Sequence, residues 1–147
     1  MEQVLHLHND VEEVPLLGEW TEQLAAETNM PPDDAFQLNM VLEEAVVNVM
    51  EYAYPGQTGM PVTLEVSVHD DVYRFVLTDE GVAFDPTADS IEPDVTQGAE
   101  ERPIGGLGIF LVKQYMQHVS YRREDGRNIL TMEYKLGTMA NLAVDML

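Results

Sequence analysis

The apolar residues of this chain change their spacing near its middle, and this change limits the possible folds more than any other feature. Between Leu38 and Ala53 they recur every three or four residues, the spacing of a helix with one face in a core. From Val62 onward they alternate with polar residues, the spacing of a strand with one buried face. The chain is therefore predicted to pack helices against a sheet.

Turn signals divide both halves of the chain into further elements. A strand is predicted over 3–8, helices over 11–28, 32–54 and 109–117, and two hairpins over 62–78 and 119–135. Strands joined by tight turns are antiparallel neighbours. We therefore expect an α/β (α+β) sandwich with a mixed, largely antiparallel sheet and helices on one face. The order of elements excludes a doubly wound parallel sheet.

The elements fit a single domain over residues 1–137, followed by a tail over 138–147 that is either a short docked helix or a frayed end. Within the domain, the segment from Asp85 to Arg102 is polar, aperiodic and longer than an ordinary connection. Such a segment is typically a functional lid or is disordered. We expect a lid that becomes ordered on a ligand.

Composition and charge exclude several classes of function. The formal net charge is −20 over 147 residues, and Arg74 is the first Lys or Arg of the chain, so a nucleic-acid partner is not expected. The acidity either keeps the protein soluble or provides a surface for a basic protein partner. Without cysteine, any chemistry must use carboxylates, hydroxyls, histidine or a bound metal. No signal sequence or spanning segment is evident, and we expect a cytoplasmic protein with no membrane contact.

Glu44 and Asn48 are one turn apart on the helix predicted over 32–54. Both lie at one border of its apolar stripe, whereas Glu43 points to the opposite flank. An Asn oxygen can ligate a hard cation such as Mg²⁺, and a neighbouring Glu can orient or deprotonate an attacking group. Taken alone, such a pair is more typical of a solvated helix edge.

Two further motifs follow strands or loops later in the chain. Asp79 ends a predicted strand, where its carboxylate can accept a hydrogen bond from an exocyclic amine, and Gly81 allows a flat ring to approach the backbone. The turn Gly105-Gly106-Leu107-Gly108 precedes a helix and exposes backbone N–H groups that suit a phosphate. Its spacing matches neither a Rossmann fingerprint nor a P-loop. Each motif alone is compatible with an ordinary turn.

The three motifs in this order resemble the N, G1 and G2 boxes of the GHKL ATPases, the superfamily that includes gyrase and the histidine kinases. The stretches LEEAVVNVMEYAYP, DEGVAFDP and RPIGGLGIFLVKQYM are similar to those of anti-sigma-factor serine kinases. The resemblance covers nearly the whole chain. It implies the GHKL, or Bergerat, ATP-binding fold, with ATP and Mg²⁺ as cofactors.

The resemblance also implies roles for individual residues. Glu44 would be the general base, Asn48 the Mg²⁺ ligand and Asp79 the acceptor for the adenine amine, with Gly81 beside the ring. The remaining residues would bind other parts of the nucleotide: Thr131 the adenine, Phe84 and Ile104 the base and ribose, Gly105, Gly106, Leu107 and Gly108 the phosphates, and Arg102 the γ-phosphate. Arg102 is equally compatible with a solvated loop position.

Two functions remain open at this stage. By resemblance, the chain is a kinase that transfers the γ-phosphoryl group of ATP to a serine of a small STAS-type anti-anti-sigma protein, and that sequesters a sigma factor or a similar protein. The alternative is a non-catalytic module in which ATP switches a protein-binding surface. The resemblance also implies a homodimer. Unlike its relatives, which commonly carry an arginine in the first helix, this chain has no Lys or Arg there.

Overall fold

The computed structural model describes residues 1–87 and 106–137, and within the latter range it describes no side chains for residues 106–110. The elements follow the chain in the order β1 (Glu2–His8), η1 (Val11–Glu13), α1 (Val14–Thr28), α2 (Pro32–Tyr52), β2 (Pro61–His69), β3 (Val72–Asp79), α3 (Gly106–Tyr115), β4 (Gln117–Glu124) and β5 (Arg127–Lys135). All predicted elements among the described residues are present.

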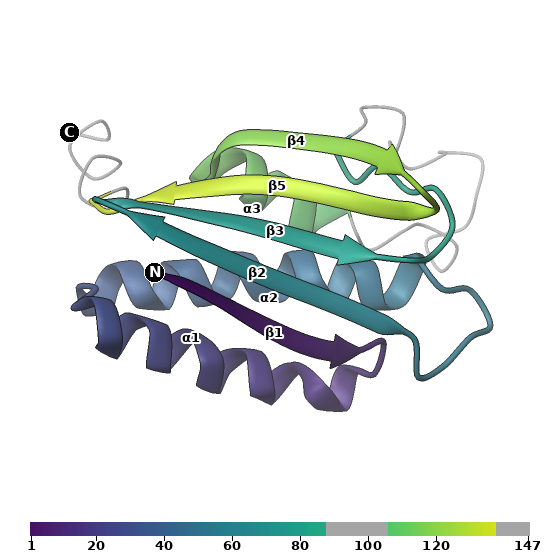
Figure 1. The fold of residues 1–147 in the computed structure, drawn as a ribbon, viewed down its shortest axis with the longest axis horizontal. Helices are drawn as coiled ribbons and strands as arrows, with labels where there is room; N and C mark the ends of the chain where they lie inside the picture. Colours follow the sequence, from purple (N-terminus) through teal and green to yellow (C-terminus); the bar gives the residue numbers. More distant parts are fainter. Residues whose placement is uncertain (88–105, 138–147) are drawn as a thin grey trace.

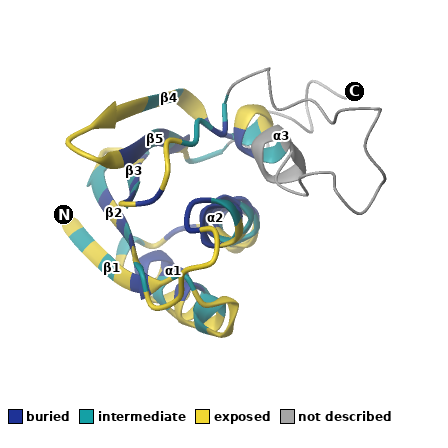
Figure 2. Cartoon of the chain, turned by 90° about the vertical axis from the view of Figure 1, so that its right-hand side faces the viewer, coloured by how far each residue is buried: buried dark blue, intermediate teal, exposed yellow. Residues whose placement is uncertain are grey.

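One curved sheet carries the fold, in the strand order β1-β2-β3-β5-β4 (Figure 1). Every pair of neighbouring strands is antiparallel, so the sheet contains no parallel pairing among the described residues. The helices α1, α2 and α3 lie on one side of it, as Figure 2 shows. The predicted α+β architecture is confirmed, with a sheet that is antiparallel throughout rather than mixed.

Several helix boundaries differ from the prediction, and α2 and α3 each end two residues early, at Tyr52 and Tyr115. The segment predicted as one helix over 11–28 begins with the short helix η1, whose first turn is capped by Asp10 through a 2.9 Å hydrogen bond from the Glu12 N–H. A separate helix, α1, begins at Val14 and has a proline in its first turn. The helix predicted from residue 109 begins at Gly106, because the first-turn N–H groups of a helix need no intrahelical partner and glycine is tolerated there.

The core lies between the sheet and the helices. α2 contributes the apolar stripe predicted from its spacing, with Leu38, Val41 and Leu42 fully buried. The inward-facing residues of β3 and β5 complete the core: Tyr73, Phe75, Leu77, Leu130, Met132 and Tyr134. Residues between them in sequence, such as Val76 and Thr131, which are paired in the register of the two strands, point to the other face.

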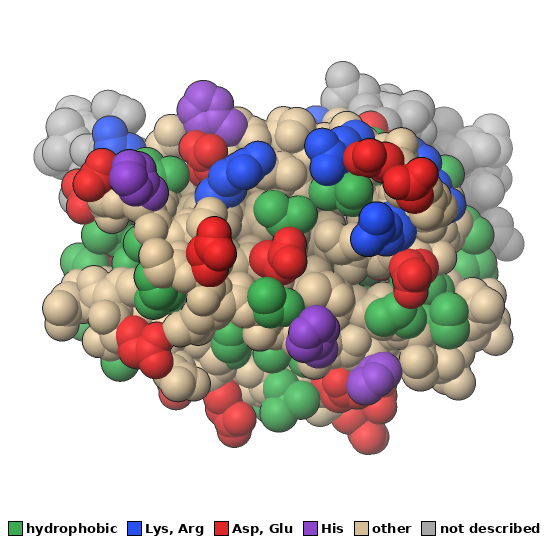
Figure 3. Space-filling model, viewed as in Figure 1, with side chains coloured by type: hydrophobic (Ala, Val, Ile, Leu, Met, Phe, Trp, Pro, Cys, Tyr) green, Lys and Arg blue, Asp and Glu red, His purple; other side chains and the backbone are tan. Residues whose placement is uncertain are grey.

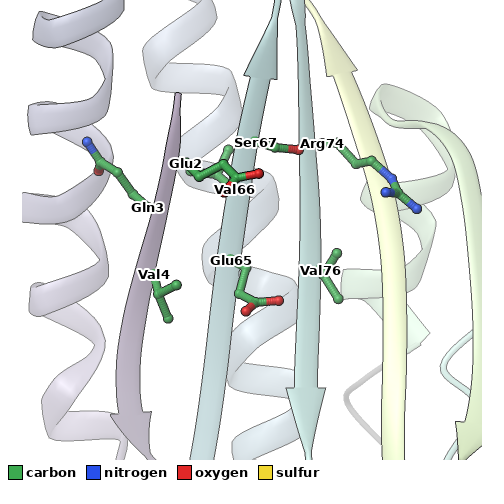
Figure 4. A pocket seen from close by; sticks show the side chains of 8 residues that line it. All are labelled: Glu2, Gln3, Val4, Glu65, Val66, Ser67, Arg74 and Val76. Carbon is green, nitrogen blue, oxygen red and sulfur yellow. The ribbon is translucent and has the colours of Figure 1, made fainter.

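The other face of the sheet is open to view in Figure 3 and mixes charged, polar and apolar side chains. A shallow hollow of about 200 Å³ lies over β1, β2 and β3, with Val4, Glu65, Arg74 and Val76 among its lining residues (Figure 4). None of the residues predicted to bind a nucleotide lines it. In the described part of the chain, no helix has both the length and the apolar character needed to cross a membrane.

Candidate functional site

Glu44 and Asn48 lie together on the flank of α2, as predicted from the helical spacing. Asn48 is 3% exposed and Glu44 is half-buried, whereas the neighbouring Glu43 is exposed. The oxygens Oε2 of Glu44 and Oδ1 of Asn48 are buried and accept no hydrogen bond from any described residue. Buried oxygens without a partner are costly, and a ligand that satisfies both at once would remove that cost.

Burial also changes the acidity of Glu44. Loss of hydration raises the pKa of its carboxyl above the usual range, and the negative charge of Glu43 raises it further. A carboxylate with a raised pKa is a stronger proton acceptor than an ordinary surface Glu. This property suits a general base that operates near neutral pH.

Asp79 ends β3, the central strand of the sheet, and is 3% exposed. Its Oδ1 atom accepts hydrogen bonds from the Gly81 N–H at 2.9 Å and from the Asn128 side-chain amide at 2.8 Å. Desolvation raises the pKa of Asp79, and these two bonds and the Arg123 charge oppose the rise. Both bonds use the same oxygen, so neither of them occupies Oδ2, and the role of Asp79 as an acceptor for a ligand stays a prediction.

The loop after Asp79 is held against the end of α2. The Val82 N–H donates to the Ala53 carbonyl oxygen at 2.8 Å, and the Glu80 N–H donates to the Tyr54 hydroxyl at 2.6 Å. A Cβ atom added at Gly81 would lie 2.1 Å from the Ala53 oxygen. Close packing on α2 therefore requires glycine at position 81, a reason that sequence reasoning did not identify.

Asn128, in β5, is a site residue that the sequence analysis missed. It pairs with Asp79 in the register of β3 and β5 and is 4% exposed. Its amide donates to Asp79 and to the Val82 carbonyl at 2.7 Å. Leu130 and Met132 follow at two-residue intervals on the buried face, so strand alternation is the signal that could have placed Asn128 inside.

Thr131 does not belong to this site, and its predicted contact with the adenine is wrong. The residue pairs with Val76 on β3 and with Ser120 on β4, on the face of the sheet opposite the helices. Asp79 and Asn128 lie on the inner face. Because successive residues of a strand point to opposite faces, Thr131 cannot reach a ligand held by Asp79.

Phe84 lies close to α2. Its ring stacks on that of Tyr52, with the centroids 6.1 Å apart and the planes at 29°. Tyr52 is one helical turn after Asn48, and Phe84 is half-buried. The predicted place of Phe84 beside a nucleotide is therefore compatible with its position, and its role stays a prediction.

The glycine turn is described in part. Gly106, Leu107 and Gly108 form the first turn of α3, where the backbone N–H groups have no partner within the helix. The N-terminus of a helix favours an anion, so these groups suit a phosphate. Arg102, Ile104, Gly105 and most of the predicted lid over 85–102 lie outside the described residues.

Comparisons with known proteins identify relatives of the whole arrangement. Residues 7–134 match the family described as the histidine kinase-like ATPase domain. The serine/threonine-protein kinase BtrW of Bordetella bronchiseptica is 31% identical over 120 residues, which cover 77% of this chain and 79% of BtrW. The serine-protein kinase RsbW of Listeria monocytogenes is 30% identical over 100 residues, and the match spans 66% of this chain and 64% of that protein.

Solved structures support the fold alone, because their sequences are distant. The RsbU and RsbW domains of Rv1364c from Mycobacterium tuberculosis superpose with a TM-score of 0.59 at 14% identity, over 91% of this chain and 32% of that one. The histidine kinase domain of the blue-light activated kinase of Erythrobacter litoralis EL346 gives a TM-score of 0.57 at 17% identity, over 88% and 65%.

Proposed function

Because the chain belongs to the family of histidine kinase-like ATPase domains, we propose that it is an ATP-dependent serine kinase of the anti-sigma-factor type. It transfers the γ-phosphoryl group of ATP to a serine of a small STAS-type partner, and it sequesters a sigma factor or a similar protein. The use of ATP follows from the family. The kinase activity and the partners rest on relatives that are about 30% identical.

The observation that carries the proposal is the pair of unpartnered buried oxygens on α2, Oε2 of Glu44 and Oδ1 of Asn48. A carboxamide oxygen is a suitable ligand for Mg²⁺, which proteins commonly bind through one or two side chains and the phosphates of a nucleotide. No group of three or more metal-binding side chains occurs among the described residues. Through its unpartnered Oδ1, Asn48 would hold the ion together with the phosphates of ATP, and the bound ion would neutralise phosphate charge.

The other end of the nucleotide would be bound by the loop after β3. Oδ2 of Asp79 accepts a hydrogen bond from the exocyclic amine of adenine, and the first-turn N–H groups of α3 donate to the phosphates. α3 packs against α2, so these donors and Asn48 belong to neighbouring elements (Figure 2). Asp79 and Asn48 thus bind opposite ends of one ATP molecule.

The chemical step needs little beyond positioning and charge neutralisation. The serine hydroxyl of the partner attacks the γ-phosphorus while Glu44 accepts the hydroxyl proton. The bond between the γ-phosphorus and the bridging oxygen breaks, and ADP leaves with that electron pair. The raised pKa of Glu44 makes it an effective proton acceptor for this step.

A matched pair of variants on α2 tests the kinase. Glu44→Gln replaces the proposed base by a neutral side chain of the same shape and leaves Asn48 unchanged. Glu43→Gln makes the same change at an exposed neighbour. In single-turnover assays with labelled ATP, Mg²⁺ and a serine-bearing partner from the same operon, we expect Glu44→Gln to lose about 10²–10⁴-fold in rate. Glu43→Gln should transfer phosphate as the parent does. Equal rates for Glu44→Gln and the parent would exclude Glu44 as the base.

The second candidate is a binding module in which ATP only sets the shape of a protein-binding surface. The absence of Lys and Arg from α1 favours it, because the relatives that the chain resembles commonly carry an arginine in that helix. Every Lys and Arg of the described part lies in β3 or later in the chain. No transfer to any operon partner, together with ATP-dependent complex formation in a pull-down, would favour the module.

Analytical ultracentrifugation would test the proposed homodimer.

A further inference from the structure

The side-chain amide of Asn128 connects four segments of the site. Its nitrogen donates to Asp79 Oδ1 and to the Val82 carbonyl. Its oxygen accepts from the Phe84 N–H at 3.1 Å, from the Tyr121 hydroxyl at 2.6 Å and from the Arg123 guanidinium at 3.1 Å. A buried carboxamide with every donor and acceptor in use is a fixed element of the site.

From this network we infer that Asn128 is a positioning residue that sets the base specificity of the site, by holding Asp79 as an acceptor for a 6-amino purine. The inference rests on the proposed function, because it requires the base to lie against Asp79. Asn128 acts through Asp79 and through the loop Gly81–Phe84, and it need not touch the nucleotide itself.

The orientation of the Asn128 amide follows from its surroundings. On one side lie two oxygens, Oδ1 of Asp79 and the Val82 carbonyl. On the other side lie three donors, from Phe84, Tyr121 and Arg123. The reversed amide would set its oxygen against two acceptors and its N–H groups against three donors. Asn128 therefore presents a donor to Asp79.

This donor matters because it favours the ionised form of Asp79. Burial alone favours the protonated carboxyl, and the opposing groups are the amide of Asn128, the Gly81 N–H and the charge of Arg123. Arg123 is itself held in place, since it donates to the Gly81 carbonyl at 2.7 Å as well as to Asn128. Without Asn128, the bond from its amide to Asp79 is lost, and Arg123 loses one of the partners that hold its charge in place.

Base specificity depends on the protonation state of Asp79. An ionised carboxylate has only acceptors, so it matches the amino group at position 6 of adenine and opposes the oxo group at the same position of hypoxanthine. A protonated carboxyl can donate to that oxo group. Any change at Asn128 that favours protonated Asp79 should therefore weaken the binding of ATP and strengthen the binding of ITP.

Asn128→Asp is the sharpest test, because it keeps the shape of the side chain and replaces the donor by a carboxylate. Two carboxyl groups at hydrogen-bond distance share one proton. We expect the parent to prefer ATP over ITP by at least about 10-fold, as for one mismatched buried hydrogen bond. In Asn128→Asp the ratio of the two Kd values, measured by calorimetry, should fall by about 10-fold.

Tyr121→Phe is the matched control. It removes one donor to the Asn128 oxygen and leaves the bond between the Asn128 amide and Asp79 intact. The preference for ATP over ITP should stay that of the parent, even if both nucleotides bind more weakly. A general loosening of the fold would instead change both variants alike.

Each outcome decides a separate question. A parent that binds ATP and ITP equally would refute the adenine site of the proposed function, whereas a discriminating parent with an unchanged ratio in Asn128→Asp would refute the role of Asn128 alone. If Asn128→Asp does not fold, Asn128→Ala removes the donor without adding charge and should show the same fall in the ratio. Loss of folding in both variants would also overturn the inference, because it would show that Asn128 is needed for the fold itself.

Discussion

Gly81→Ala isolates the contact between the loop after β3 and the end of α2. The added Cβ atom would lie 2.1 Å from the Ala53 carbonyl oxygen, 2.6 Å from its carbon and 2.8 Å from the Ala53 Cβ. Such contacts are essentially never shorter than 3.0 Å, so the loop and the helix must separate by at least about 0.9 Å, the difference between 3.0 Å and 2.1 Å. Two of these atoms are backbone atoms of the buried Ala53 and the third is its Cβ, so none of them can move away by a side-chain rotation.

The separation removes specific interactions. The bond from the Val82 N–H to the Ala53 oxygen and the bond from the Glu80 N–H to the Tyr54 hydroxyl both span this contact. Each hydrogen bond contributes about 0.5–1.5 kcal/mol, and overpacking of a close contact costs about 1–3 kcal/mol. We expect a loss of about 2–4 kcal/mol in the free energy of unfolding, or roughly 5–15 °C in Tm for a chain of this size.

Thermal unfolding followed by circular dichroism measures this loss, with Gly18→Ala as the control. Gly18 lies within α1, and the nearest atom to an added Cβ, outside its own helix, is Asn39 Oδ1 at 4.0 Å. Alanine is favoured over glycine inside a helix by about 0.5–1 kcal/mol, so this variant should be more stable than the parent. A Tm for Gly81→Ala within about 1 °C of the parent would show that the loop does not pack on Ala53 in this way.

Three further predictions concern single side chains. Asp79→Asn should weaken ATP binding by about 1–3 kcal/mol, because it replaces an acceptor by an amide that faces other donors, and parent-like affinity in calorimetry would reject the adenine acceptor. Glu44→Gln should stabilise the fold at pH 8 and have little effect near pH 4: the folded pKa of Glu44 is raised, so its ionisation above that pKa costs stability, and no such cost exists below the unfolded pKa. Urea titrations at the two pH values test this, and a stabilisation seen only at low pH would contradict it. Tyr54→Phe leaves the Pro61 carbonyl and the Glu80 N–H without their hydroxyl partner and should cost about 1–3 kcal/mol in the same assay. An unchanged urea midpoint would show that water replaces the hydroxyl at both groups.

Periodicity explains which parts of the fold could be predicted from the sequence. The stripe on α2 and the alternation in β2 and β3 are local patterns, so the elements and the antiparallel hairpins followed directly. The orientation of Glu44 and Asn48 followed from the same helical geometry. The start of α3 did not, because a helix imposes weak requirements on its first turn, and glycines there can belong either to a loop or to the helix.

Contacts between distant segments explain what could not be predicted. The contact between Gly81 and the Ala53 carbonyl could not be predicted, because only the tertiary structure brings these two residues together. The partner of Asp79 on β5 depends on the register of two strands that are far apart in sequence. Alternation from the buried Leu130 would have excluded Thr131 from the inner face. The role of Thr131 came from the family resemblance of the stretch that contains it, and such a resemblance takes no account of which face of the strand a residue occupies.

The helix α2 also acts as a spacer of fixed length. Asn48 lies five residues before Ala53, a distance of about 7.5 Å along the axis at 1.5 Å per residue. The first residue is the proposed metal ligand, and the second supports the loop that carries Asp79. One residue inserted between them would turn Asn48 by about 100° relative to that loop, so that the two ends of a nucleotide could no longer be bound together. Length variation among related chains should therefore be absent from this interval and concentrated in connections such as the turn between β2 and β3, where Asp70 and Asp71 protrude beyond the sheet.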